Sequence, residues 1–78
     1  MEITTKIMQG DAIILEIDNY LEPERATLLA RECGIDGRLR IEHAISDSSE
    51  EIIYSQYTIN EKNKIISALY PYRYLMKE

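Results

Sequence analysis

The feature that most constrains the fold is the alternation of apolar and polar residues near the start of the chain. Residues 2–8 and 12–18 both alternate, and Gly10 and Asp11 stand between them. Successive side chains of a strand point to opposite faces, so each run predicts a strand with one buried face. A glycine beside an aspartate accepts the positive φ that a tight turn needs. We therefore predict a hairpin made of these two strands.

A helix is predicted to follow this hairpin, over residues 23–33. Pro23 suits the first helical turn, where its missing N–H costs nothing. Gly34 suits the position just after the last turn. Between them, apolar residues recur at helical spacing and form one face, made of Ala26, Leu29, Ala30 and Cys33.

Two further strands are predicted in the second half of the chain. Residues 38–45 (RLRIEHAI) alternate strictly, which is typical of a strand with one wet face. Residues 51–58 (EIIYSQYT) are rich in β-branched and aromatic side chains, which favour strands. A polar loop joins the two runs.

A second helix is predicted over residues 60–70. Thr58 and Glu61 have the spacing of a capping box, and an apolar stripe follows them. Pro71 would end such a helix, because proline cannot continue one.

These elements predict an α+β fold in the order ββαββα, as a single domain over residues 1–78. A four-stranded, mainly antiparallel sheet would carry two helices packed on one face. Residues 13–31 and 52–69 share one plan of strand, polar turn and helix. One interpretation is a duplicated ββα unit, and the other is that any two such units look alike. Either way, each hairpin needs a helix to cover its apolar face.

Composition excludes several classes of protein. With 14 acidic and 9 basic residues the net charge is −5, which opposes non-specific binding to nucleic acid and to anionic membranes. The single cysteine cannot form an internal disulfide, which suits the reducing cytoplasm where we expect the protein. No apolar run approaches the roughly 18 residues of a membrane span.

No pattern in the chain predicts catalysis, a metal site or a bound cofactor, so we expect a protein that is not an enzyme. His43 is the single histidine, and on the apolar face of its strand it is more often a core residue than a base. Burial could also bring its pKa into a range that senses pH. Cys33 lies on the helix's apolar stripe and behaves there as a small hydrophobe. A small enzyme or ligand carrier would have to act through His43.

Tyrosine is the one aromatic residue type, with six Tyr and neither Phe nor Trp. The C-terminal tail, residues 71–78, is rich in it. If the tail is extended, Tyr72 and Tyr74 share one side and Arg73 takes the other. Tyrosine and arginine are enriched at protein interfaces. The rings either fill the core in place of Phe and Trp or form a surface for a partner.

The leading hypothesis is a small acidic protein-binding module without enzymatic activity. In size, acidity and lack of catalytic groups the chain resembles, in type, small bacterial or phage-encoded inhibitors such as anti-CRISPR proteins and antitoxins. Its partner would be another protein, a second copy of the chain as a homodimer, or both. In a regular strand Tyr54 and Tyr57 face opposite sides, so at least one should lie outside the core. The predicted contact residues are Tyr54, Tyr72, Arg73 and Tyr74, with Glu50 and Glu51 as an acidic rim.

The alternative hypothesis is a regulatory protein that binds nucleic acid or imitates DNA. A small basic patch would consist of Arg25, Arg31, Arg38 and Arg40. In an acidic chain the simpler interpretation of these arginines is charge balance with nearby carboxylates. A strong DNA mimic would carry more charge than −5 on this length.

Overall fold

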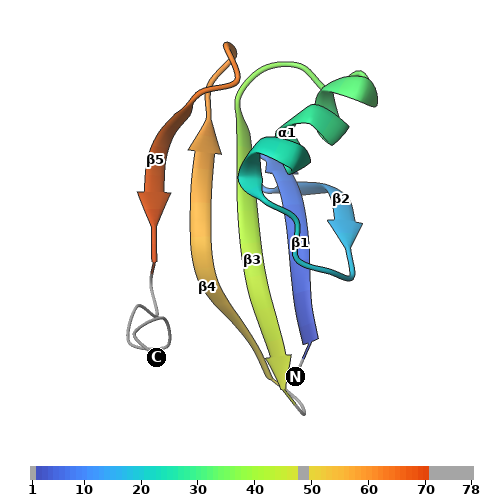
Figure 1. The fold of residues 1–78 in the computed structure, drawn as a ribbon, viewed down its shortest axis with the longest axis vertical. Coiled ribbons are helices and arrows are strands. Elements are labelled where there is room, and N and C mark those ends of the chain that lie inside the picture. The colour runs from blue at the N-terminus through green and yellow to red at the C-terminus, as the bar shows by residue number, and fades with distance from the viewer. Residues whose placement is uncertain (1, 48–49, 71–78) are drawn as a thin grey trace.

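The computed structural model describes residues 2–47 and 50–70. Within these ranges it forms one antiparallel sheet, with the strands in the order β2-β1-β3-β4-β5, and one helix. Along the chain the elements are β1 (Glu2–Gln9), β2 (Ala12–Ile17), α1 (Pro23–Glu32), β3 (Leu39–Asp47), β4 (Glu50–Ile59) and β5 (Ile65–Leu69). Figure 1 shows α1 lying across one end of one sheet face, with β2 and β5 at the two opposite edges.

The predicted first hairpin and first helix are confirmed. Gly10 has φ 63° in the turn between β1 and β2, a conformation that glycine adopts without strain. Pro23 is the first residue of α1, and the chain leaves the helix through Gly34, which has φ 83°. At ten residues, α1 is too short to cross a bilayer, and it is the one helix in the described part of the chain.

The second predicted helix is wrong. After β4 the chain turns and returns as β5, which pairs antiparallel with β4 through Tyr57 opposite Ala68 and Thr58 opposite Ser67. The sheet therefore has five strands rather than four, and in the described residues one helix covers it rather than two. This also removes the basis for a duplicated ββα unit, since the second half of the chain has no helix after its strands in residues 50–70.

Two asparagines explain why the chain turns here. The Asn60 side chain accepts hydrogen bonds at Oδ1 from the backbone N–H groups of Lys62 and Lys64, at 2.8 and 2.9 Å. Asn63 has φ 66°, the left-handed region that asparagine tolerates better than most residues. These local bonds compete directly with helix formation. They outweigh the capping-box spacing of the preceding residues.

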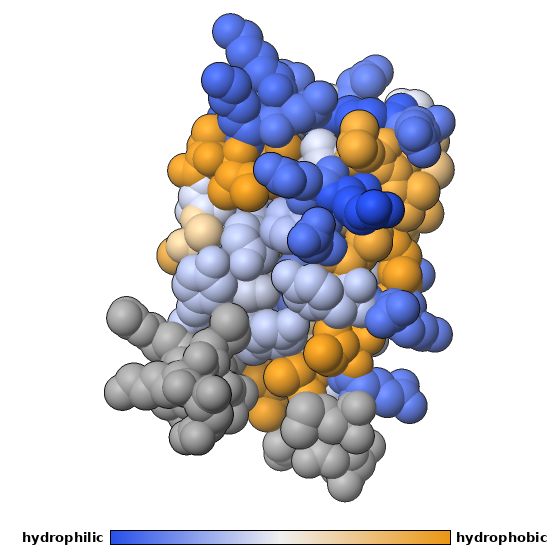
Figure 2. All heavy atoms as spheres, in the orientation of Figure 1, coloured by the Kyte–Doolittle hydropathy of each residue, from blue (hydrophilic) through white to orange (hydrophobic). Residues whose placement is uncertain are grey.

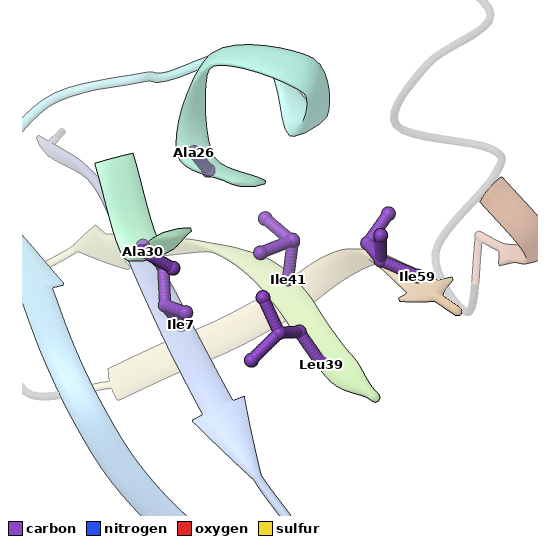
Figure 3. Close-up of a cluster of buried hydrophobic side chains, with 6 residues drawn as sticks. All are labelled: Ile7, Ala26, Ala30, Leu39, Ile41 and Ile59. Carbon is purple, nitrogen blue, oxygen red and sulfur yellow. The ribbon is translucent and has the colours of Figure 1, made fainter. Parts of the chain in front are cut away.

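The core lies between α1 and the sheet. Ala26 and Ala30, the residues of α1 that face it, have no exposed surface. Their short side chains let the helix approach the strands closely. Figure 3 shows the buried cluster of Ile7, Ala26, Ala30, Leu39, Ile41 and Ile59.

Arg31, near the end of α1, ties the helix to the β4–β5 turn. Its Nε donates to Asn63 Oδ1 at 2.7 Å, and one Nη donates to the carbonyl oxygen of Asn60 at 3.2 Å. The other Nη donates to the carbonyl oxygen of Ile35 at 2.9 Å, which satisfies the loop after the helix. One guanidinium therefore fixes three segments relative to one another.

The sheet face opposite α1 carries charged side chains and is called here the charged face. Lys6 Nζ lies 2.6 Å from Glu51 Oε1, and Arg40 Nε lies 2.8 Å from Glu42 Oε2. The hydrogen bond to Glu51 raises the pKa of Lys6 above its ordinary value. Within the described residues no helix covers this face. The Lys6–Glu51 pair joins β1 to β4, whereas Arg40 and Glu42 pair along β3.

Candidate functional site: a tyrosine surface around His43

His43, in the middle of β3, has no exposed surface, and both ring nitrogens are hydrogen-bonded. Nε2 lies 2.7 Å from the carbonyl oxygen of Leu21. A carbonyl can only accept, so Nε2 carries the proton. Nδ1, 2.9 Å from Ser55 Oγ, therefore accepts the hydroxyl proton of Ser55. Burial lowers the pKa of His43 despite the bond to Leu21, so the ring is neutral at pH 7.

Three tyrosine rings surround this imidazole. Tyr20 stacks on it with ring centroids 4.5 Å apart and planes 27° apart. Tyr57 meets it edge-on, with centroids 5.8 Å apart, and Tyr54 lies tilted at 6.0 Å. Such offset and edge-on geometries are those that aromatic rings prefer. The buried histidine on β3 thus contacts tyrosines from two other segments, β4 and the segment that leads into α1.

The position of Tyr20 is set by Thr5 on β1. The Thr5 hydroxyl donates to the carbonyl oxygen of Asn19 at 2.7 Å and accepts from the N–H of Leu21 at 2.9 Å. It therefore holds the residues on both sides of Tyr20. Leu21 is also the residue that accepts from His43, so one short segment aligns both the ring and its stacking partner.

A β-bulge brings Tyr54 to the same side as Tyr57. His43 pairs with Ser55, but the next residue of β3, Ala44, pairs with Ile53, so Tyr54 is an extra residue with no partner. A bulge changes the direction in which the side chain of the extra residue points. The prediction that Tyr54 and Tyr57 face opposite sides is therefore wrong, since both rings lie within 6.0 Å of the His43 ring.

Tyr70, just after β5, completes the group. Its hydroxyl lies 3.2 Å from that of Tyr57, and the two rings meet at 88° with centroids 5.9 Å apart. Burial, together with the hydrogen bond to Tyr70, raises the pKa of Tyr57 to about 12. Burial also raises the pKa of Tyr54. These phenols are therefore neutral at physiological pH.

The tyrosine surface is defined here as Tyr20, Tyr54, Tyr57 and Tyr70. It lies on the α1 side of the sheet, on the part that the helix leaves uncovered. Tyr20 is 45% exposed and Tyr70 39%, while the two tyrosines of β4 are half-buried. In Figure 2 a pale blue, weakly hydrophilic band crosses the middle of this face, with orange hydrophobic areas above and below it. The rings present aromatic area and hydroxyl groups to solvent together.

Both imidazole nitrogens of His43 are hydrogen-bonded within the fold, and the ring has no exposed surface. A shallow groove of about 470 Å³ lies elsewhere, along the outer side of α1, and is lined by Leu21, Arg25, Leu28, Leu29 and Glu32. Among residues 2–47 and 50–70, no three His, Cys, Asp or Glu side chains gather to hold a metal ion.

The predicted partner-binding residues are separated. Tyr54 belongs to the tyrosine surface, whereas Glu51 pairs with Lys6 on the charged face. The tail residues Tyr72, Arg73 and Tyr74, and the side chain of Glu50, lie outside what the structure describes. The predicted contact residues did not include Tyr20, Tyr57 or Tyr70. The aromatic composition of the chain was the available signal, but the contacts of Tyr20 and Tyr57 with His43, and of Tyr70 with Tyr57, depend on long-range packing.

The four arginines of the predicted basic patch do not share one surface. Arg31 is engaged with the β4–β5 turn, and Arg40 pairs with Glu42 on the charged face, opposite α1. Arg25 lies exposed on α1 and Arg38 exposed just before β3. The pairing of Arg40 agrees with the simpler interpretation of charge balance.

Cys33 is exposed at the end of α1 rather than buried on its stripe, because the helix ends at Glu32. In comparisons with known proteins, no family model, curated protein or solved structure matches this chain.

Proposed function

We propose that the protein is a small non-enzymatic binding module that contacts another protein through the tyrosine surface. The observation that carries the proposal is the gathering of three partly exposed tyrosines around one buried, hydrogen-bonded histidine, with a fourth, Tyr70, packed against Tyr57. Tyrosine supplies a large contact area with few rotatable bonds and a polar tip, which is why it is enriched at interfaces.

The rings are held by contacts within the chain itself. Thr5 fixes the backbone around Tyr20, His43 stacks beneath its ring, and the hydroxyl of Tyr70 meets that of Tyr57. A binding surface that is already ordered loses less side-chain entropy on association. This favours recognition by a preformed surface over folding on binding.

The charge distribution favours a protein partner over a phosphate backbone. The phenols of Tyr54 and Tyr57 and the imidazole of His43 are neutral near pH 7, since burial raises the pKa of the two tyrosines and lowers that of the histidine. Asp18 and Glu22, the nearest charged residues to Tyr20 in the chain, are exposed acids. An acidic border would speed the approach of a partner whose matching surface is basic.

A module of this kind acts by covering part of its partner. Because the single histidine of these 78 residues has both ring nitrogens engaged in the fold, the role proposed is inhibition by occupation of a surface, as in the class of bacterial or phage-encoded inhibitors that includes anti-CRISPR proteins and antitoxins. The cytoplasm remains the expected compartment, because the chain has a single cysteine.

The test uses a photo-crosslinking residue, benzoylphenylalanine, placed at position 20 and, as a control, at position 28. Leu28 is 61% exposed on α1 and lies outside the tyrosine surface. We expect one protein to be crosslinked from position 20 and not from position 28. That protein is then purified and its affinity measured by calorimetry against the unmodified chain.

The affinity measurement is repeated with Tyr20→Ser/Tyr70→Ser and with Leu28→Ser. Truncating one tyrosine that is a binding hot spot costs about 2 kcal/mol or more, so the double variant should lose at least about 30-fold in affinity. Leu28→Ser should bind as the original chain does. Equal binding by all three chains, with circular dichroism showing each one folded, would reject the proposal. Crosslinking to nucleic acid with a steep salt dependence would favour the alternative hypothesis.

A further inference from the structure

Strand β5 leaves an unusually apolar edge on the sheet. It is the last strand in the sheet order, and within the described residues it pairs with β4 alone. All five of its residues (IISAL) are exposed, and none is charged. Ile65, Ile66 and Leu69 are 45, 49 and 56% exposed. An open edge of this kind readily pairs with another strand, and many proteins avoid that with charges or prolines.

The opposite edge, β2, is protected by charge. β2 carries Glu16, and Asp11 and Asp18 lie exposed just beyond its two ends. Charged residues in and around an edge strand act against unwanted pairing. β2 also exposes Ile13 and Ile14, and Lys64 lies exposed just before β5, so the difference between the two edges is the carboxylate within β2. β5 has no charged residue along its length, which marks it as the edge more open to pairing.

We propose that β5 pairs antiparallel with β5 of a second copy of the chain, about a two-fold axis, so that one sheet runs through both copies. Full overlap of the strand Ile65–Leu69 places Ser67 opposite Ser67 at the axis. It places Ile65 opposite Leu69 and Ile66 opposite Ala68. The inference does not rest on the proposed function, although Tyr70 borders both the tyrosine surface and this edge.

The residues at the ends of this overlap are also complementary. The same register brings Lys64 opposite Tyr70 of the second copy, so a cation meets an aromatic ring rather than another lysine. Tyr70 is 39% exposed, and a lysine beside a tyrosine ring is a favourable contact. Because the pairing is symmetric, this contact forms twice.

A second copy fits the edge better than a chain of copies joined β5 to β2. Symmetric pairing uses the same surface on both copies, so assembly stops at a dimer. Pairing of β5 with β2 would leave a free edge at each end and would build an open chain of copies. It would also set Glu16 against the uncharged β5. A small chain buries only a limited share of its surface on folding, so the surface buried between two copies would add to its stability.

The first test is the solution mass measured by sedimentation over a concentration series. A five-residue strand edge is a small interface, so we expect weak association. The mass should rise from 9.1 kDa toward twice that value between about 10 μM and about 1 mM. Ile66→Lys should stay monomeric throughout, because it places like charges on both sides of the axis. The control Leu28→Lys adds the same charge on α1 and should associate as the original chain does.

The second test does not depend on how well Ile66→Lys folds. In a Cys33→Ser background, Ser67→Cys brings two thiols opposite each other at the axis, within reach of a disulfide. Mild oxidation should convert most of this variant to a covalent dimer, whereas Leu28→Cys in the same background should react far more slowly. A mass of 9.1 kDa at every concentration, or equal crosslinking of both variants, would overturn the proposal. So would a mass that keeps growing beyond that of a dimer.

Discussion

The Nε2 of His43 and the carbonyl oxygen of Leu21 lie 2.7 Å apart, joining the centre of β3 to the segment that leads into α1. With Ser55 on the other nitrogen, this bond fixes the tautomer and orientation of the ring. The histidine is therefore a structural residue on which the tyrosine surface is assembled, and its loss should affect stability first.

We expect His43→Leu to lower the free energy of unfolding by about 2–4 kcal/mol, because it leaves a buried carbonyl and the Ser55 hydroxyl without partners. Urea unfolding followed by circular dichroism measures the change. Ser55→Ala removes one of these bonds together with its hydroxyl and should cost about 1 kcal/mol. A change below about 0.5 kcal/mol for His43→Leu would contradict the structural role.

Stability should also fall as the pH is lowered below about 6.5. Burial lowers the pKa of His43, so in this range the unfolded chain binds a proton that the folded chain resists. The contribution is fully present above the unfolded pKa and is lost as the pH falls toward the folded pKa. Burial raises the pKa of two of the ring's neighbours, Tyr54 and Tyr57, so these phenols stay neutral there. Urea midpoints at pH 7.5, 6.5 and 5.5 should decline in the original chain and much less in His43→Leu, and parallel declines would refute the assignment.

The left-handed backbone at Asn63 gives a separate test of the β4–β5 turn. Asn63→Gly and Asn63→Val both remove the side-chain oxygen that accepts from Arg31, so the difference between them reports on φ 66° alone. We expect Asn63→Val to be less stable than Asn63→Gly by about 1–2 kcal/mol. Thermal unfolding measures the difference. If the two variants melt together, the turn adopts another conformation.

The ion pair on the charged face should give a small, measurable coupling. Lys6 and Glu51 are 2.6 Å apart, but the Glu51 side chain is 42% exposed, so water screens the interaction. A double-mutant cycle with Lys6→Met and Glu51→Gln should give about 0.5–1 kcal/mol. The matched cycle of Lys6→Met with Glu22→Gln, an exposed acid beside α1, should give none. Equal couplings would point to a general charge effect.

Local patterns predicted the first hairpin, the helix and the central strands, because alternation and proline position act over a few residues. They did not predict β5. The run IISAL is a short apolar stretch that fits a strand or a buried helical turn equally well. The asparagines at 60 and 63 are a turn signal, whereas the capping-box spacing of Thr58 and Glu61 favours a helix at the same place.

The candidate site was less predictable than the fold. The position of His43 on the apolar face follows from alternation, but its two hydrogen bonds join residues 12 and 22 positions away. The bulge at Tyr54 has no local sequence signal, since it depends on how β4 pairs with β3. Tyrosine content alone therefore indicated an aromatic surface without identifying its members.

The extra residue in β4 has a consequence for how such a chain can change. If Tyr54 were deleted, Ile53 and Ser55 would become neighbours and would still face Ala44 and His43, so the ladder would become regular rather than shift. A one-codon insertion or deletion at this point would thus add or remove a single aromatic contact while every other pairing stayed as it was. Lineages descended from such a gene could vary their recognition surface by length as well as by substitution.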